Sequence, residues 1–303
     1  MRVISYLLLG AIISLSGCSS KDEEYTTEAD LYEAINDQLD RSQWEAAIKN
    51  LNTMEENFPF GTYAEQSQLE LIYAQYQSGE ADAAIATANR FIRLHPQHRN
   101  VDYAYYMLGM STFTKDSGFF DRVMPIDMSK RDPGAARESL GHFTQLLNRF
   151  PDSSYAVDAK KRMLHLRNRI ARNEIHAANY YFKRGAYLAA VARGRYVLEN
   201  YPQTGATPDA IAVMIQGYRL MKMSAQAEEM LALLKLNYPG YPAINEDGSF
   251  NDRFMYNEGK FNWAAWLTLG LFSKTEISGF DTRKIYDPEF KEQASNTAPK
   301  PNS

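Results

Sequence analysis

Cysteine, excess positive charge and long apolar runs are all scarce in this chain of 303 residues. The single cysteine, Cys18, excludes an intramolecular disulfide and a zinc site built from several cysteines. Lysine and arginine number 33 against 37 acidic residues, and the formal charge of -4 lacks the electrostatic footprint of a general nucleic-acid-binding protein. We therefore expect no nucleic acid among its partners. The composition, 45% hydrophobic and 23% charged, still provides for an ordinary packed interior.

Common sequence patterns of catalytic and metal sites are also missing. The sequence has no glycine-rich phosphate loop, no GxSxG and no HExxH pattern. His95 and His98 flank Pro96, which interrupts a helix, so they do not share a regular helix face. We therefore expect no enzyme, no metal site and no cofactor.

The first residues have the pattern of an export signal. Arg2 precedes an apolar run over residues 3–13, and these eleven residues are fewer than the roughly 20 that span a bilayer. The run leads into Leu15-Ser16-Gly17-Cys18, which resembles the bacterial lipobox, where a signal peptidase cuts before the cysteine and the cysteine is acylated.

This resemblance divides the start of the chain into two segments. We expect a lipoprotein signal peptide over residues 1–17 and a lipidated, flexible polar tether over residues 18–28, with a covalent lipid on Cys18. Ser19 stands where sorting rules of such lipoproteins favour the outer membrane. An ordinary signal peptide with a fortuitous cysteine is the alternative.

Five segments share one internal register, in which a proline follows a small residue by twelve positions. The pairs are Ala47 and Pro59, Ala84 and Pro96, Ser139 and Pro151, Ala190 and Pro202, and Ala227 and Pro239. A small residue lets two antiparallel helices approach closely, and proline ends a helix because it lacks a backbone donor. The pattern resembles the tetratricopeptide repeat, although the proline spacings of 37, 55, 51 and 37 exceed the usual repeat of about 34 residues.

A partner helix is expected before each of these five segments. We place the partner helices near residues 29–39, 63–78, 101–113, 155–184 and 208–221. Sustained alternation with period two is missing, so almost no sheet is expected. The predicted fold is therefore all-α, an α-solenoid of about five tetratricopeptide-like helix pairs with a C-terminal extension.

Three regions follow from this register. N-terminal repeats are predicted over residues 29–151 and C-terminal repeats over 152–239. The extension, residues 240–303, is expected to form a helical cap around the aromatic residues 261–272 and then a disordered tail. The alternative for 261–272 is an aromatic element that contacts a partner or the lipid interface.

Residues 31–239 resemble the BamD family, lipoprotein subunits of the outer-membrane β-barrel assembly machinery. The motifs that carry the resemblance are Phe58-Pro59-Phe60-Gly61, Phe91-Ile92-Arg93-Leu94-His95-Pro96 and Asn148-Arg149-Phe150-Pro151. The resemblance implies a non-enzymatic assembly factor on the periplasmic face of the outer membrane. It also implies docking on the POTRA region of BamA, contacts with BamC and BamE, and recognition of nascent β-barrel proteins.

Two other functions stay open from the sequence. A tetratricopeptide-repeat pilotin, a lipoprotein that carries secretin or pilus subunits to the outer membrane, has the same anchor and repeats. A cell-wall enzyme is a third class, disfavoured by the missing catalytic pattern.

A basic block identifies a candidate docking face. Residues 160–195 contain ten basic residues and one acidic residue, and such a block can steer and orient an acidic partner. In the family, the contact with the barrel subunit maps to the C-terminal repeats, and Arg193 matches an arginine there. The resemblance therefore implies Arg193 as a BamA-binding residue, with Arg195 and Arg184 as companions. A solvated helix surface is the alternative.

Aromatic residues of the N-terminal repeats are candidates for a substrate-peptide groove. Barrel substrates end in an aromatic-rich segment, and aromatic side chains can hold apolar peptide residues. The candidate residues are Tyr73, Tyr76, Tyr106, Phe60 and Tyr63. Ordinary packing between helices is the alternative.

Overall fold

The computed structural model describes residues 27–115, 127–256 and 279–287. Regular structure within these ranges is helical, apart from one isolated antiparallel bridge between Ile244 and Phe250. Cys18 and the helix expected at residues 261–272 lie outside the described residues. Among the helices that are described, none has both the length and the apolar character needed to cross a bilayer.

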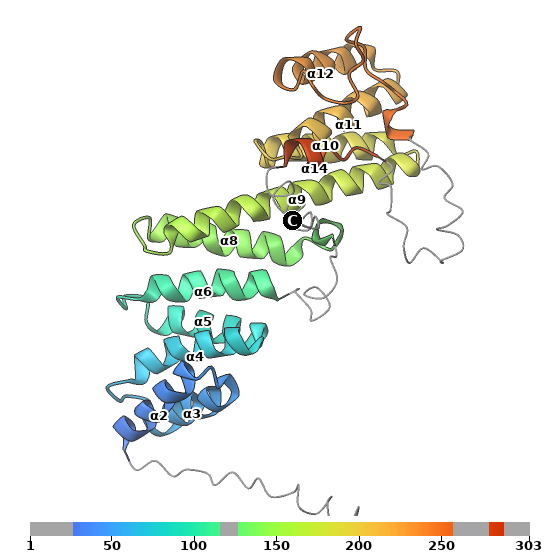
Figure 1. The fold of residues 1–303 in the computed structure, drawn as a ribbon. Helices are drawn as coiled ribbons and strands as arrows, with labels where there is room; N and C mark the ends of the chain where they lie inside the picture. The colour runs from blue at the N-terminus through green and yellow to red at the C-terminus, as the bar shows by residue number, and fades with distance from the viewer. Residues whose placement is uncertain (1–26, 116–126, 257–278, 288–303) are drawn as a thin grey trace, which may run out of the picture. The chain divides into compact units, whose positions relative to one another are not determined.

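The described residues from 27 to 79 form one compact part of the chain, called here the N-terminal part. Its described helices are α2 (Glu28–Asp40), α3 (Trp44–Asn57) and α4 (Ala64–Ser78) (Figure 1). Helix α3 packs against both α2 and α4. The buried core of this part comprises Leu31, Ile35, Ala47, Leu51, Met54, Leu71 and Ala74.

The described residues from 80 onward form the second compact part. Its long helices are α5 (Ala81–Leu94), α6 (Val101–Thr114), α8 (Gly134–Arg149), α9 (Ala156–Lys183), α10 (Tyr187–Asn200), α11 (Thr207–Leu220) and α12 (Ser224–Asn237). Each long helix packs against the next one along the chain, and α9 also contacts α11 (Figure 1). Three short helices complete the part: η1 (Met128–Lys130), η2 (Phe254–Tyr256) and α14 (Arg283–Tyr286).

The predicted register of small residues and prolines is confirmed. Helices α3, α5, α8, α10 and α12 each end two residues before the proline of their segment, and the five small residues are at most 1% exposed. The partner helices begin and end within one or two residues of their predicted bounds. The all-α class of tetratricopeptide-like helices is therefore confirmed, including a lengthened helix, α9, of 28 residues.

Helices α10 and α11 come especially close at Gly194. A Cβ atom placed there would lie 2.7 Å from the carbonyl oxygen of Ala210 and 3.0 Å from Cγ of Met214. The carbonyl is backbone and cannot move without shifting α11. Glycine is therefore required at this contact by close approach, and not by an unusual backbone angle.

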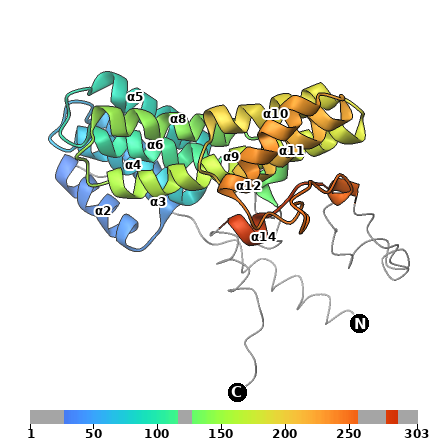
Figure 2. The same cartoon turned by 90° about the horizontal axis from the view of Figure 1, so that it is seen from above.

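The described segments of the C-terminal extension, residues 240–256 and 279–287, pack against the helical repeats of the second part. These segments, drawn orange to red in Figure 2, run along one side of α9–α12. Tyr241 is 1% exposed and Phe280 is fully buried. No sequence pattern predicted this docking, which builds the polar cluster described below.

We predict opposite effects for two glycine-to-alanine substitutions. Gly194→Ala should lower the free energy of unfolding by about 1–3 kcal/mol, because the added methyl group overpacks the contact between α10 and α11. The matched control is Gly141→Ala on an open surface of α8, where no atom lies within 4 Å of the added Cβ. It should raise stability by roughly 0.5–1 kcal/mol through helix propensity. Urea unfolding followed by circular dichroism measures both, and equal effects would contradict the close approach.

Candidate docking site

Arg193, the predicted docking residue, lies on α10 and forms an ion pair inside the chain. Its Nη1 atom donates to Oε2 of Glu174 at 3.0 Å, and its guanidinium lies 5.7 Å from the ring centroid of Tyr181. These contacts with Tyr181 and Glu174 raise the pKa of Arg193. The side chain of Arg193 is 43% exposed, so its charged guanidinium, held in one orientation, still faces solvent.

Glu174 is the buried anchor of this arrangement. Its side chain is 1% exposed, and Arg137 Nη2 donates to its other carboxylate oxygen at 2.7 Å. The carboxylate therefore joins α8, α9 and α10, and it fixes Arg193 in one orientation. A buried carboxylate with two arginine partners satisfies the requirement that buried charges be paired.

Arg195 and Arg184 are each held by one tyrosine. Arg195 Nη2 donates to the hydroxyl of Tyr218 at 3.0 Å, and Arg184 Nε donates to that of Tyr180, also at 3.0 Å. A guanidinium has five N–H donors, so one such bond leaves most of them for a partner.

Exposed apolar side chains lie near the turn between α9 and α10, which carries Arg184. Tyr180, close to the end of α9, is 52% exposed, and Leu188, close to the start of α10, is 71% exposed. Arginine together with exposed aromatic and aliphatic side chains is the composition typical of protein interfaces.

The basic block as a whole is not a continuous surface. Arg172 is 3% exposed and forms a buried ion pair with Asp209. Arg162 donates to Asp158 at 2.5 Å, four residues earlier on the same helix. Counting charges along the sequence treated both as surface residues, whereas Arg172 belongs to the interior.

The groove candidates of the N-terminal part have different surroundings. Tyr63 stacks on Tyr32 with ring centroids 4.1 Å apart, and Tyr73 makes an edge contact with Trp44 at 5.7 Å. Tyr76 is half-buried on α4, whereas Phe60 is 99% exposed in the turn before it. Packing thus accounts for Tyr63 and Tyr73 but not for the exposed ring of Phe60.

Tyr106, the groove candidate of the second part, is committed to packing between α6 and α9. Its hydroxyl donates to Oδ2 of Asp158 at 2.6 Å, and its ring stacks on Tyr155 at 4.8 Å. Burial and the bond to Asp158 raise its pKa to about 12. Peptide binding by the aromatic candidates stays a prediction.

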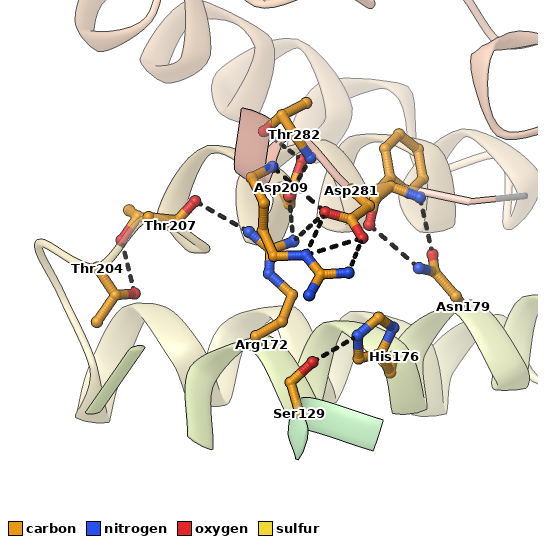
Figure 3. Close-up of polar contacts among 12 residues, drawn as sticks. Ser129, Arg172, His176, Asn179, Thr204, Thr207, Asp209, Asp281 and Thr282 are labelled. Carbon is orange, nitrogen blue, oxygen red and sulfur yellow. Dashed lines mark hydrogen bonds and ion pairs between the residues drawn. The ribbon is translucent and has the colours of Figure 1, made fainter. Parts of the chain in front are cut away.

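Sequence reasoning missed a buried polar cluster centred on Asp209 of α11 (Figure 3). Arg172, reaching across from α9, donates to Oδ2 of Asp209. The Tyr241 hydroxyl donates to Oδ1 at 2.8 Å. Thr282 of the C-terminal extension donates both its backbone N–H, to Oδ2, and its hydroxyl, to Oδ1, each at 2.9 Å. One fully buried carboxylate thus joins α9, α11 and both described segments of the extension.

The cluster continues towards the turn that carries η1. Arg283 Nη2 contacts Asp281 at 2.7 Å and Asp127 at 2.9 Å. The Ser129 hydroxyl donates to Asp127 at 2.6 Å and lies 3.0 Å from Nε2 of His176. Although burial alone would raise the pKa of Asp127, the bonds from Arg283 and Ser129 outweigh it and lower that pKa to about 2.

Only a weak sequence signal could have found this cluster. Asp209 is a lone charge at the start of the otherwise apolar segment 207–215, which is a hint of a buried, paired carboxylate. Its partners Arg172 and Thr282 lie 37 and 73 residues away, and no spacing rule connects them. Within the described ranges, no group of three or more His, Cys, Asp or Glu side chains is placed to hold a metal ion.

Helices paired at small residues, with a proline just beyond the second helix of each pair, define a helical-repeat protein of the tetratricopeptide class. The sequence also matches, over residues 24–233, the family described as YfiO, outer membrane lipoprotein. The chain belongs to this family. The match ends inside α12, so residues 240–303 lie beyond it.

Curated relatives carry a common name, outer membrane protein assembly factor BamD. The protein of Neisseria meningitidis serogroup B is 36% identical over 248 residues, which cover 79% of this chain and 93% of the relative. That of Xylella fastidiosa is 33% identical over 240 residues, covering 78% and 82%. That of Vibrio cholerae is 33% identical over 239 residues, covering 77% and 99%.

We predict that His176 makes stability depend on pH. Burial lowers its pKa to about 4, although Asp127 and Asp281 oppose this and only Arg283 and Arg172 reinforce it. An unfolded histidine takes up a proton below about pH 6.5, whereas the folded one stays neutral to about pH 4. The free energy of unfolding should therefore fall, by up to about 3 kcal/mol, as the pH drops through this window.

Urea unfolding at several pH values measures this effect. His176→Gln, which can still bond to Ser129, should remove most of the decrease between pH 6.5 and 4. A variant that keeps the full decrease would show that His176 is not its source.

Proposed function

We propose that this chain is an outer membrane protein assembly factor, a non-enzymatic scaffold that assists insertion and folding of β-barrel proteins. The observation that carries the proposal is the family match over most of the helical repeats, together with relatives that are named for this role and covered over 82–99% of their length. Stacked helix pairs suit a scaffold because they offer an extended surface for other polypeptides.

The proposed location is the periplasmic face of the outer membrane. A lipid on Cys18 would anchor the chain there, with the polar residues 19–26 as a tether. The tether predicted from the sequence ran to residue 28, but Thr27 caps α2 and Glu28 is its first residue. Several acyl chains on one residue bind a membrane far more firmly than a single chain. The lipobox-like sequence and the description of the family as outer membrane lipoproteins support this anchor.

The proposed partner of the C-terminal repeats is the POTRA region of BamA. Arg193 would be the principal contact because Glu174 and Tyr181 orient its guanidinium while much of it stays exposed. A pre-oriented arginine loses less entropy when it pairs with a carboxylate of the partner. Arg195 and Arg184 would extend the contact, and Tyr180 and Leu188 would supply its apolar area.

Further partners are proposed on the family resemblance. These are the accessory lipoproteins BamC and BamE and the nascent β-barrel proteins themselves. For the barrel proteins, exposed Phe60 is the best-placed residue of the N-terminal part, because its ring is available for an aromatic peptide residue.

Depletion in the native host tests the function. Loss of the chain should lower the amount of many folded β-barrel proteins in the outer membrane, measured by heat-modifiable mobility of whole outer-membrane fractions. A pilotin would instead affect one secretin or pilus system and spare the rest, and that outcome would contradict the proposal.

Charge reversal tests the docking contact. Arg193→Glu should reduce co-purification with BamA from envelopes by tenfold or more, since a close interfacial charge pair contributes on the order of 1.5 kcal/mol or more. Arg195→Glu, which leaves Glu174 untouched, should give a smaller loss. The matched control is Arg41→Glu in the N-terminal part, where Arg41 forms a surface pair with Asp37.

Circular dichroism of each purified variant separates lost docking from lost folding. A folded Arg193→Glu chain that still co-purifies with BamA at the wild-type level would remove Arg193 from the contact.

A further inference from the structure

The C-terminal segment 279–287, named here the strap, is held by the repeats in the manner of a bound peptide. It is reached from residue 256 by a chain segment outside the described residues, yet it contacts α9, α11 and the turn before η1. The side chains of Asn179, Arg172 and Asp209 that face it are named here the strap groove (Figure 3).

Asn179 of α9 recognises the backbone of the strap. Its Oδ1 accepts the backbone N–H of Phe280 at 3.0 Å, and its Nδ2 donates to the carbonyl of the same residue at 3.1 Å. One side-chain amide thus pairs with both polar groups of one peptide residue, as a neighbouring strand would. Such recognition depends on the backbone of the bound residue and not on its side chain.

Gly279 allows this close approach. Its φ is +130°, and a Cβ there would lie 2.5 Å from Cγ of Asn179. A side chain at position 279 would therefore push the strap away from the amide that binds it. Glycine directly before the aromatic residue is part of the fit.

Side chains of the strap fill complementary positions. Phe280 is fully buried, and its ring centroid lies 6.2 Å from that of Phe182 on α9 and 5.9 Å from that of Phe254. Thr282 gives two hydrogen bonds to Asp209, which is itself fully buried. Lys284 and Ile285 point outward and are exposed.

Charge fixes the direction of the strap. Asp281 lies 3.6 Å from Arg172 of α9, and Arg283 lies 2.9 Å from Asp127 of the turn before η1. Acidic Asp281 thus faces a basic residue, and basic Arg283, two positions later, faces an acidic residue. A chain running the other way would place like charges together.

We propose that the strap groove is a peptide-binding site and that the strap is its tethered ligand. The site takes a short segment with the pattern glycine, aromatic, acidic, hydroxyl and basic, which residues 279–283 supply within the same chain. The inference does not depend on the proposed function, because the strap lies beyond the matched family region.

The test is binding in trans. A protease site is inserted between residues 257 and 278 of the full chain. The strap of this chain also carries Phe280→Ala, which weakens its binding so that the fragment dissociates after cleavage. A labelled synthetic peptide of residues 277–289 is then titrated and followed by fluorescence anisotropy. Saturable binding below about 100 μM is expected.

Peptide variants show whether the binding follows the observed contacts. Phe280→Ala and Thr282→Val in the peptide should each weaken binding about tenfold or more. The first removes a buried ring, and the second removes the hydroxyl that donates to Asp209. Lys284→Ala is the matched control and should bind as the wild type does. Asn179→Ala in the chain should also weaken binding of the wild-type peptide.

Three results would each overturn the proposal. One is no binding at about 100 μM by a cleaved chain that circular dichroism shows to be folded. Another is equal binding by all peptide variants. The third is unfolding of the chain once its fragment leaves, which would make the strap a part of the core.

Discussion

A fully buried carboxylate must be matched by donors, and Asp209 imposes this requirement on the C-terminal repeats. Its two oxygens accept bonds from Arg172 on α9, Tyr241 after α12, and Thr282 of the strap. Each donor comes from a different stretch of the chain. Satisfying one charge therefore holds α9, α11 and the extension against one another, because the loss of any one of these donors leaves the buried carboxylate less well matched.

Around this point the fold is built by simple local rules. Small residues such as Ala190 let neighbouring helices meet, and a proline two residues beyond the end of the second helix of each pair defines where the chain turns. Gly194 shows how close the contact becomes, since even a methyl group would meet the backbone of α11. The oriented arginine at 193 depends on the same packing, because Glu174 is buried where α8, α9 and α10 meet.

These local rules explain which features the sequence could predict. Each small residue lies in the helix that ends just before the proline twelve positions later. Both residues are therefore visible as a local pattern along the chain, and this pattern predicted the helix bounds closely. The environment of Arg193 could not be predicted, because Glu174 appeared only as the single acid in a basic block. Arg172 was counted as surface charge for the same reason, although its partner lies 37 residues away.

The aromatic candidates show a second limit. An aromatic residue has the same sequence signature whether it packs against a neighbouring helix, as Tyr106 does, or its ring faces solvent, as that of Phe60 does. Only three-dimensional contacts separate the two. The extension was hardest to predict, since its short helices and isolated bridge have no periodic pattern and its contacts span up to 101 residues.

The central claim is that the strap is bound through Asp209 and Asn179 and folds onto α9 and α11. Amide hydrogen exchange at Phe280 and Thr282 tests it most directly, because the N–H groups of these residues donate to those two side chains. Both amides should exchange at least about 100-fold more slowly than in an unstructured peptide, and Asp209→Asn should remove that protection while amides of α5 and α6 keep theirs. Exchange at the free-peptide rate in the unmodified chain would contradict the claim.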